Sequence, residues 1–277
     1  MSYARRIDRL SPGLIIVMVD QSDSMSEVIE GGALSKAQAV ADQLNTLLYE
    51  LVLRCVKTPR EPPRAYFFVS VIGYSTTSRG EPVVGPALSV ADTGGVVSTT
   101  DLAVHPLRVE NRAGPGGGTV NSPVWVEPLA RGGTPMCAAF DQAGRLTADW
   151  VARHPDAFPP VVVNLSDGEA TDGDPGVWAN RLRGLSTSDG SALLFNLSLS
   201  ASRSTVSLFP SDASALHDAY AEKLFGMSSP LPPSMIEIAR SQGLAVARGA
   251  RGFAYNADFR ALAMFMNVGT SIGRVAR

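Results

Sequence analysis

Cysteine is scarce in this chain, which has two among its 277 residues. Cys55 and Cys137 each fall in a helix-like segment among apolar neighbours. A single pair is not a disulfide framework in a domain of this size, so we interpret both as small buried hydrophobes and expect no redox role. Free thiols fit a reducing cytoplasm, which is the location that we expect for this protein.

An excess of charge of one sign is also lacking. Lys and Arg number 24 against 26 Asp and Glu, which leaves a formal net charge of -2. This balance gives no electrostatic reason to expect a nucleic acid or an anionic membrane as the partner. No apolar run approaches the roughly 20 residues of a membrane-spanning helix. Residues 1–12 are polar and arginine-rich, without the apolar core of a secretion signal.

Sequence signatures of common catalytic sites are missing or weak. His105, His154 and His217 are scattered without metal-ligand spacing, and we interpret them as solvated loop residues. The chain has no Gly-x-x-x-x-Gly-Lys motif, and the glycine-rich run 114–118 does not open a helix, so it indicates a hairpin tip. Gly269–Gly273 has the spacing of a nucleophile elbow, but it ends a helix-like run and no histidine follows it.

Apolar runs that alternate with helical patterns dominate the rest of the chain. They predict one α/β domain over residues 1–277 with a Rossmann-like, mostly parallel sheet and helices on both faces. A β-rich insertion at 76–131 and an irregular insertion at 200–233 are expected to interrupt it. The expected strands are 14–19, 66–74, 107–110, 120–126, 161–165, 192–199 and 252–255. The expected helices are 34–56, 135–152, 176–185, 234–242 and 257–272, with a helical turn within 213–225.

Three loops carry oxygen-bearing side chains at places where a parallel sheet collects ligands. Asp20, Ser22 and Ser24 directly follow the apolar run 14–19, Thr134 lies just before a predicted helix, and Asp167 follows the run 161–165. Ligands of open α/β sheets bind beyond the carboxyl ends of the strands. Hydroxyls and carboxylates are hard donors that suit Mg²⁺, Mn²⁺ or Ca²⁺ better than zinc or copper.

The order of these residues resembles the metal-ion-dependent adhesion site of von Willebrand factor A domains. The family pattern is Asp-x-Ser-x-Ser, then a distant Thr, then a distant Asp, and Asp20, Ser22, Ser24, Thr134 and Asp167 match it in order. Their surroundings, Gly-Gly-Thr-Pro-Met and Ser-Asp-Gly-Glu, are similar to those of stand-alone bacterial members. The resemblance covers nearly the whole chain.

The resemblance implies a non-catalytic protein-binding module that holds one divalent ion. In the family, the two serines bind the ion directly, which here would be Ser22 and Ser24. Thr134 would bind it directly or through water, and Asp20 and Asp167 would orient hydroxyls and waters around it. A Glu or Asp carboxylate of a protein partner completes the coordination in such sites. An ion held mainly by neutral hydroxyls keeps positive charge that such a carboxylate supplies.

Asp23 departs from the family pattern, because many members have glycine at this position. Asp tolerates a left-handed backbone, so Asp23 is expected to satisfy the loop geometry. The alternative is an acidic group that raises metal affinity or hinders a carboxylate partner. Asp172 and Asp174 follow in a run typical of a turn and a helix start.

Two wider interpretations remain open at this point. The alternative in a different class is a phosphoesterase that uses the same ion, with Glu169 and Asp23 as added carboxylates. The cellular role implied by the resemblance is a scaffold in a bacterial signalling, stress or defence assembly, like proteins associated with tellurium resistance, and an adhesion or secretion role is the alternative. The two insertions border the metal site or a sheet edge in this interpretation, where they would set partner specificity; the alternative is that they are neutral surface decoration.

Overall fold

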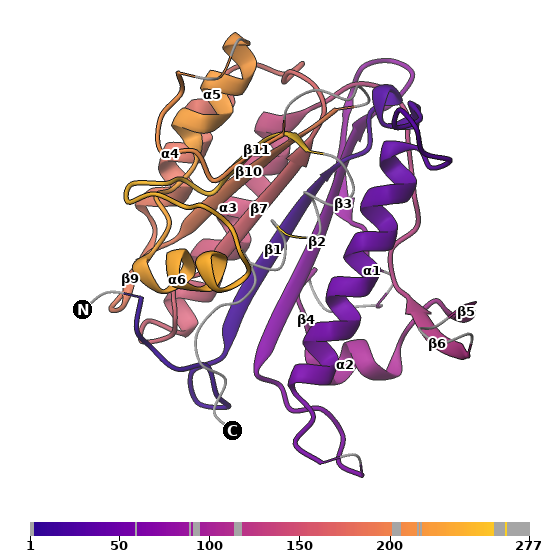
Figure 1. Cartoon of the computed structure of the whole chain (residues 1–277), viewed down its shortest axis with the longest axis vertical. Helices are drawn as coiled ribbons and strands as arrows, with labels where there is room; N and C mark the ends of the chain where they lie inside the picture. Colours follow the sequence, from indigo (N-terminus) through magenta and orange to yellow (C-terminus); the bar gives the residue numbers. More distant parts are fainter. Residues whose placement is uncertain are drawn as a thin grey trace.

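The structure is a computed structural model that describes residues 3–58, 60–88, 90, 95–113, 118–200, 206–214, 216, 218–257 and 264. Apolar and amphipathic segments form an eight-stranded, mostly parallel sheet between two layers of helices (Figure 1). The predicted Rossmann-like α/β fold is therefore confirmed. The sheet order is β11 (Ser207–Leu208), β12 (Phe253–Ala257), β10 (Leu193–Leu199), β7 (Val161–Ser166), β1 (Gly13–Asp20), β2 (Phe67–Thr76) and β3 (Pro82–Pro86), with β4 (Val97–Ser98) also paired to β2.

The five central strands are parallel, in the order β12, β10, β7, β1 and β2, and β1 lies inside this group. It pairs with β2 on one side and with β7 on the other, and β10 and β12 continue the sheet beyond β7. Every residue of β1 is buried, as expected of a strand that is covered on both faces. Val19 lies opposite Leu165 in the register, so β1 and β7 end side by side at the same edge.

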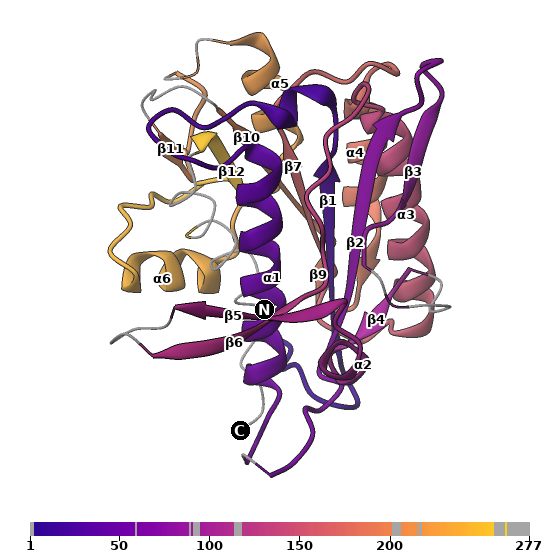
Figure 2. The same cartoon turned by 90° about the vertical axis from the view of Figure 1, so that its right-hand side faces the viewer.

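Helices cover both faces of the sheet. They are α1 (Lys36–Arg54), α2 (Thr99–Val104), α3 (Met136–Arg153), α4 (Pro175–Gly184), α5 (Ala219–Met227) and α6 (Pro233–Ser241). Val17 of β1 belongs to a buried cluster that includes residues of α1, α2 and α6, whereas its neighbour Ile16 belongs to a cluster with α3, α4 and α5. Figure 2 shows α1 and α6 on one side of the sheet and α3 and α4 on the other.

The first helix shows how local sequence sets an element boundary. Ser35 accepts a hydrogen bond from the Gln38 backbone N–H, and the Gln38 side chain accepts one from the Ser35 N–H. This capping box satisfies backbone donors that a helix start otherwise leaves free. It fixes the start of α1 close to the carboxyl end of β1, and α1 then descends along the sheet.

The predicted insertion 76–131 contributes edge strands, a short helix and a separate hairpin. β3 and β4 pair antiparallel with β2, and β5 (Arg108–Ala113) pairs with β6 (Thr119–Val124) in a two-stranded ribbon. The ribbon lies against α1, where Arg112 forms a 2.8 Å ion pair with Asp42. Both ends of the segment reach the edge where β1 ends, and at one of them the Arg131 N–H donates to the Gln21 carbonyl at 2.7 Å. Gly133 N–H, just beyond 131, donates a 2.7 Å hydrogen bond to Thr76 Oγ1.

The later part of the chain departs more from the expectations. Within 200–233, α5 begins at Ala219, and the short strand β11 pairs with β12. A further hairpin, β8 (Ser186–Thr187) with β9 (Gly190–Ser191), precedes β10. The expected closing helix 257–272 and the run Gly269–Gly273 lie outside the described residues, apart from residue 264, which is helical. The boundaries of the single domain and of its insertions stay predictions.

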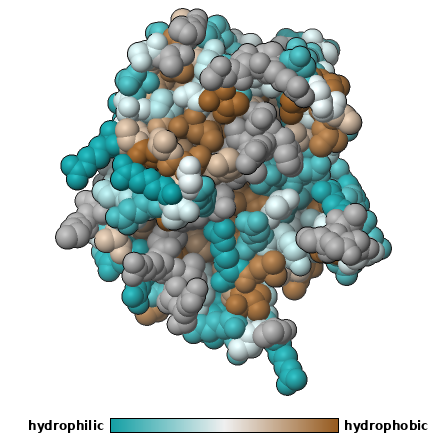
Figure 3. Space-filling view, in the orientation of Figure 1, coloured by the Kyte–Doolittle hydropathy of each residue, from teal (hydrophilic) through white to brown (hydrophobic). Residues whose placement is uncertain are grey.

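Polar residues interrupt the outer surface. In the view of Figure 3, hydrophobic patches are separated by hydrophilic residues. Within the described residues, no helix combines the length and the apolar character needed to cross a membrane.

Candidate metal site

The first loop of the candidate site holds two serine hydroxyls beside a buried carboxylate. Asp20 ends β1 and has no exposed surface. Its Oδ1 accepts a 2.9 Å hydrogen bond from the Ser22 backbone N–H. A 3₁₀ turn, η1 (Asp23–Ser26), then brings Ser24 Oγ to 3.0 Å from Ser22 Oγ. The alternation in Asp20-x-Ser22-x-Ser24 therefore places both hydroxyls together.

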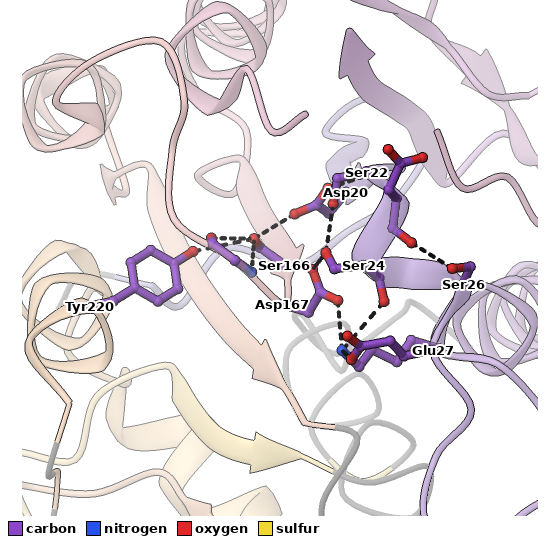
Figure 4. A network of polar contacts seen from close by, with 11 residues as sticks. Asp20, Ser22, Ser24, Ser26, Glu27, Ser166, Asp167 and Tyr220 are labelled. Carbon is purple, nitrogen blue, oxygen red and sulfur yellow. Dashed lines mark hydrogen bonds and ion pairs between the residues drawn. The ribbon is translucent and has the colours of Figure 1, made fainter. Parts of the chain in front are cut away.

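The loop after β7 joins this cluster through two short hydrogen bonds. Ser24 Oγ donates to Asp167 Oδ1 at 2.7 Å, and Ser166 Oγ donates to Asp20 Oδ2 at 2.7 Å. Figure 4 shows these side chains pointing toward one another from the ends of β1 and β7, with Tyr220 of α5 behind Ser166. The Tyr220 hydroxyl donates to Ser166 Oγ at 3.2 Å. The parallel register of β1 and β7 thus brings together Asp20 and Asp167, which are far apart in sequence.

The third loop lies between the other two and carries Thr134, which is 5% exposed. Its backbone N–H donates to Thr171 Oγ1 at 3.2 Å, and its carbonyl accepts from the Thr171 N–H at 2.9 Å. A Cβ added at Gly168 would lie 3.8 Å from Thr134 Oγ1, so this hydroxyl faces the loop that carries Asp167. Backbone bonds also join the first and third loops, since Asp23 N–H donates to the Gly132 carbonyl at 2.9 Å.

Gly132 is the position in this loop where only glycine fits. Its φ is +68°, in the left-handed region that side chains disfavour. A Cβ at this residue would also lie 2.4 Å from the Thr76 carbonyl oxygen. The loop can therefore pass close to the end of β2 and return toward η1. Glycine at position 132 is thus required by the geometry of the loop as well as by the sequence pattern.

Burial and like charge raise the pKa of Asp20 to about 6 from its ordinary value of 3.8. Burial disfavours the charged form most strongly, hydrogen bonds from Ser166 and Ser22 act in the opposite direction, and the charge of Asp167 raises the pKa further. Near neutral pH this carboxylate is therefore ionised at an energetic cost. A bound cation would relieve that cost.

Lys36 is a member of this cluster that the sequence analysis missed. Its Nζ forms a 2.8 Å ion pair with Asp167 Oδ2 and a 2.7 Å ion pair with Glu27 Oε2. Burial acts to lower the pKa of Lys36, but its hydrogen bonds and ion pairs with Asp167 and Glu27 outweigh this and raise it. The helical pattern of 34–56 placed Lys36 at the start of an amphipathic helix. This pattern gave no indication that its side chain would contact Asp167 in the candidate site.

Two other expectations change when the structure is considered. Asp23 does not adopt the left-handed backbone that its place in the loop suggested, because η1 begins here and the right-handed turn requires no glycine. Asp23 is an exposed residue, and its backbone carbonyl accepts a hydrogen bond from Ser26 Oγ at 2.6 Å. His154 is not a simple solvated residue, since its ring centroid lies 4.1 Å from that of Trp150.

Asp172 and Asp174 cap helices, in accordance with their place in a predicted turn and helix start. Asp172 accepts hydrogen bonds from the Cys137 and Ala138 backbone N–H groups, each at 2.9 Å, and so serves α3 from a distant loop. Asp174 accepts from the Gly176 N–H at the start of α4. Cys137 is buried, and burial together with the Asp172 charge raises the pKa of its thiol to about 12.

The donor set and its spacing fit a small hard dication. Within the described part of the chain, no three His, Cys, Asp or Glu side chains gather as a metal-binding group. The donors near one another here are instead mainly serine hydroxyls. Ligands that occupy neighbouring positions of an octahedron at 2.0–2.1 Å from Mg²⁺ lie about 2.9 Å apart. The Ser22 and Ser24 hydroxyls, which form a hydrogen bond with each other, lie 3.0 Å apart, close to this spacing.

Comparisons with known proteins do not place the chain in a family. No protein-family model matches it, and no curated protein matches its sequence. It is similar to the pilus adhesin SpaC from Lactobacillus rhamnosus GG, with a TM-score of 0.45 and 13% identity over 96% of this chain and 32% of the adhesin. It is also similar to the human COPII-coat protein Sec24c, with a TM-score of 0.27 and 11% identity over 70% of this chain and 26% of Sec24c.

The chain spans about a third of the length of the adhesin and about a quarter of that of Sec24c. Similarities at this level assign neither a family nor an activity.

Proposed function

We propose that this chain is a von Willebrand factor A domain whose adhesion site binds Mg²⁺ or Mn²⁺, and through the ion a carboxylate of a protein partner. The observation that carries the proposal is the meeting of the two serine hydroxyls, 3.0 Å apart, beside the carboxylate of Asp167. Ser24 Oγ donates its proton to Asp167 Oδ1 at 2.7 Å. A hydroxyl whose proton is held by a carboxylate keeps its lone pairs for a cation.

The environment of the two carboxylates supports different roles for the carboxylates and the hydroxyls of the proposed site. Asp20 Oδ1 and Oδ2 accept hydrogen bonds from Ser22 N–H and Ser166 Oγ, and Asp167 Oδ1 and Oδ2 accept from Ser24 Oγ and Lys36 Nζ. All four carboxylate oxygens therefore already have donors within the protein. Asp20 and Asp167 would orient the groups around the ion, while Ser22, Ser24 and Thr134 would face it.

A protein carboxylate is the ligand class that best completes such a site. Neutral hydroxyls do not neutralise a dication, so positive charge remains at the open position. A phosphoesterase at the same ion is the alternative, and it would bring several carboxylates into contact with the metal. Glu169 and Asp23, the residues needed for that role, are exposed residues whose side chains are not part of the hydrogen-bonded cluster. We therefore propose a non-catalytic module that acts as a scaffold within a bacterial assembly.

The proposal is tested by magnesium titration in a calorimeter, followed by partner capture. The wild-type protein should bind one Mg²⁺, and the double variant Ser22→Ala, Ser24→Ala should lose this binding while it keeps its circular dichroism spectrum. The double variant Ser188→Ala, Ser241→Ala removes two exposed serine hydroxyls, which contact Asp156 and the Ile238 carbonyl, and this matched control should bind as wild type. Partners retained in Mg²⁺ should be released by EDTA and absent from the double variant. Equal capture in all arms would refute a metal-mediated grip, and phosphoester turnover lost in the double variant would favour the hydrolase.

A further inference from the structure

Lys36 is a buried cation fixed beside the candidate metal site. Its side chain is 5% exposed, and the Asp167 side chain that it contacts is 0% exposed. The ammonium also lies 2.7 Å from Glu27 Oε2 and 3.5 Å from the Ser24 carbonyl oxygen. Lysine is rarely buried unless it is paired, because removing its charge from water costs free energy. At this position the ion pairs of Lys36 offset that cost.

The two oxygens of Asp167 divide between the serine and the lysine. Oδ1 accepts from Ser24 Oγ, which we assign to the ion, and Oδ2 accepts from Lys36 Nζ. Lys36 therefore contacts the site through the Asp167 carboxylate, and it uses a different oxygen of Asp167 from the one that Ser24 Oγ uses. Its charge acts on the site from behind Asp167.

The sum of charges shows what that position does. With Asp20, Asp167 and Glu27 ionised, these three carboxylates and Lys36 carry a net charge of -2, and the hydroxyls of Ser22, Ser24 and Thr134 add none. A dication brings this sum to zero, whereas without Lys36 the sum would be -1. Coulomb repulsion from a nearby buried charge weakens the binding of an ion, and attraction strengthens the binding of an anion.

We propose that Lys36 makes metal binding depend on the carboxylate ligand. This inference rests on the proposed function of the site. The lysine charge lowers the affinity of the protein alone for the dication and raises the affinity of the metal-loaded site for a carboxylate. Metal and carboxylate bind with positive coupling because their charges are opposite, and each raises the affinity for the other by the same factor. Lys36 makes the protein depend on this coupling, because it weakens binding of the metal alone. Glu27 moderates the effect, because its carboxylate offsets part of the lysine charge from an exposed position.

The test measures Mn²⁺ binding by electron paramagnetic resonance of the free ion, with acetate as the carboxylate probe and chloride as the matched anion. Lys36→Met should bind Mn²⁺ about tenfold more tightly than wild type in chloride. At one fixed, subsaturating acetate concentration, the factor by which acetate raises the apparent Mn²⁺ affinity should shrink in this variant, because its metal-loaded site binds acetate more weakly. Lys36→Arg keeps the charge and should keep the wild-type factor. A lysine that only supports the loops would instead weaken Mn²⁺ binding when it is removed.

Glu27→Gln provides a second test with the opposite sign. Glu27 has a side chain that is 58% exposed, so its replacement leaves the fold in place if Lys36→Met does not fold. The change leaves more of the lysine charge unbalanced, so Mn²⁺ binding in chloride should weaken about twofold to threefold and the effect of acetate should grow. Glu50→Gln removes the same charge from the far part of α1, where Glu50 contacts Arg54, and should change neither quantity.

The outcomes separate this inference from the proposed function. If wild type binds no Mn²⁺, the proposed function is overturned and the inference with it. If wild type binds Mn²⁺ but Lys36→Met binds no more tightly, or Glu27→Gln binds no more weakly, the role of Lys36 is overturned and the metal site stands.

Discussion

Replacing Asp20 by Asn is expected to stabilise the metal-free protein near neutral pH. Asp20 is fully buried, and its pKa is raised to about 6, first by burial and further by the charge of Asp167. Asn is neutral and nearly the same size. The substitution therefore removes the cost of an ionised buried carboxylate but keeps the packing at the end of β1.

The magnitude follows from the pKa. The pKa of Asp20 rises from 3.8 to about 6 on folding. A difference of about 2 pKa units corresponds to ~3 kcal/mol. The amide replaces one accepting oxygen by a donor, which costs about 1 kcal/mol if the new geometry is imperfect. Ser166 limits this cost, since its hydroxyl can turn from Asp20 to the Gly168 carbonyl at 3.0 Å and accept from the new amide. The expected net gain is ~2 kcal/mol.

The sign depends on pH. Because the pKa of Asp20 is raised in the folded state, the folded protein holds this proton more tightly than the unfolded chain. The stability from the protonated carboxyl is fully present below about pH 4 and is lost as the pH rises through about 6. Asp20→Asn should therefore differ little from wild type at about pH 4 and be more stable at about pH 7.5.

Urea denaturation in EDTA at the two pH values measures this difference in unfolding free energy. Added Mg²⁺ should then stabilise wild type and should stabilise Asp20→Asn much less, since a ligand stabilises the state that binds it. The reasoning is refuted if Asp20→Asn is less stable than wild type near neutral pH in EDTA, or if the difference is the same at both pH values.

Two further substitutions test the framework of the site. Gly132→Ala should lower the unfolding free energy, measured in urea, by at least about 2 kcal/mol. The reason is that φ of residue 132 is +68° and a Cβ would lie 2.4 Å from the Thr76 carbonyl oxygen. A loss below half of this value would contradict the geometry. Asn45→Ala should cost about 2–4 kcal/mol, since the buried Asn45 side chain accepts from the Trp125 and Val126 N–H groups and donates to the Val126 carbonyl. A thermal melt checks this second change, and a midpoint equal to that of wild type would contradict it.

The central elements could be predicted from the sequence because their patterns are strong. The continuous apolar run at 14–19 became β1, and the spacing of apolar residues in 34–56 matched α1. The short elements α2, β4 and β11 were not predicted, because two to six residues carry too little periodicity to stand out. The pairing of these edge strands depends on the neighbouring strand, which local sequence does not contain.

The grouping of the candidate site residues was predicted in part for the same reason. Asp20, Ser22 and Ser24 share one loop, and the strand pattern placed Asp167 at the same edge of the sheet. Lys36 and Thr171 were missed because their contributions depend on contacts across loops, to Asp167 and Thr134 respectively. A useful signal in hindsight is a lysine at the buried start of α1, where its charge requires a partner.

Diffraction from crystals grown with Mn²⁺ tests the central claim most directly. The account predicts one anomalous peak within about 2.3 Å of both Ser22 Oγ and Ser24 Oγ, with Thr134 facing it and Asp167 still bonded to Ser24. An ion bound elsewhere, or serine hydroxyls without an ion between them at saturating Mn²⁺, would contradict it.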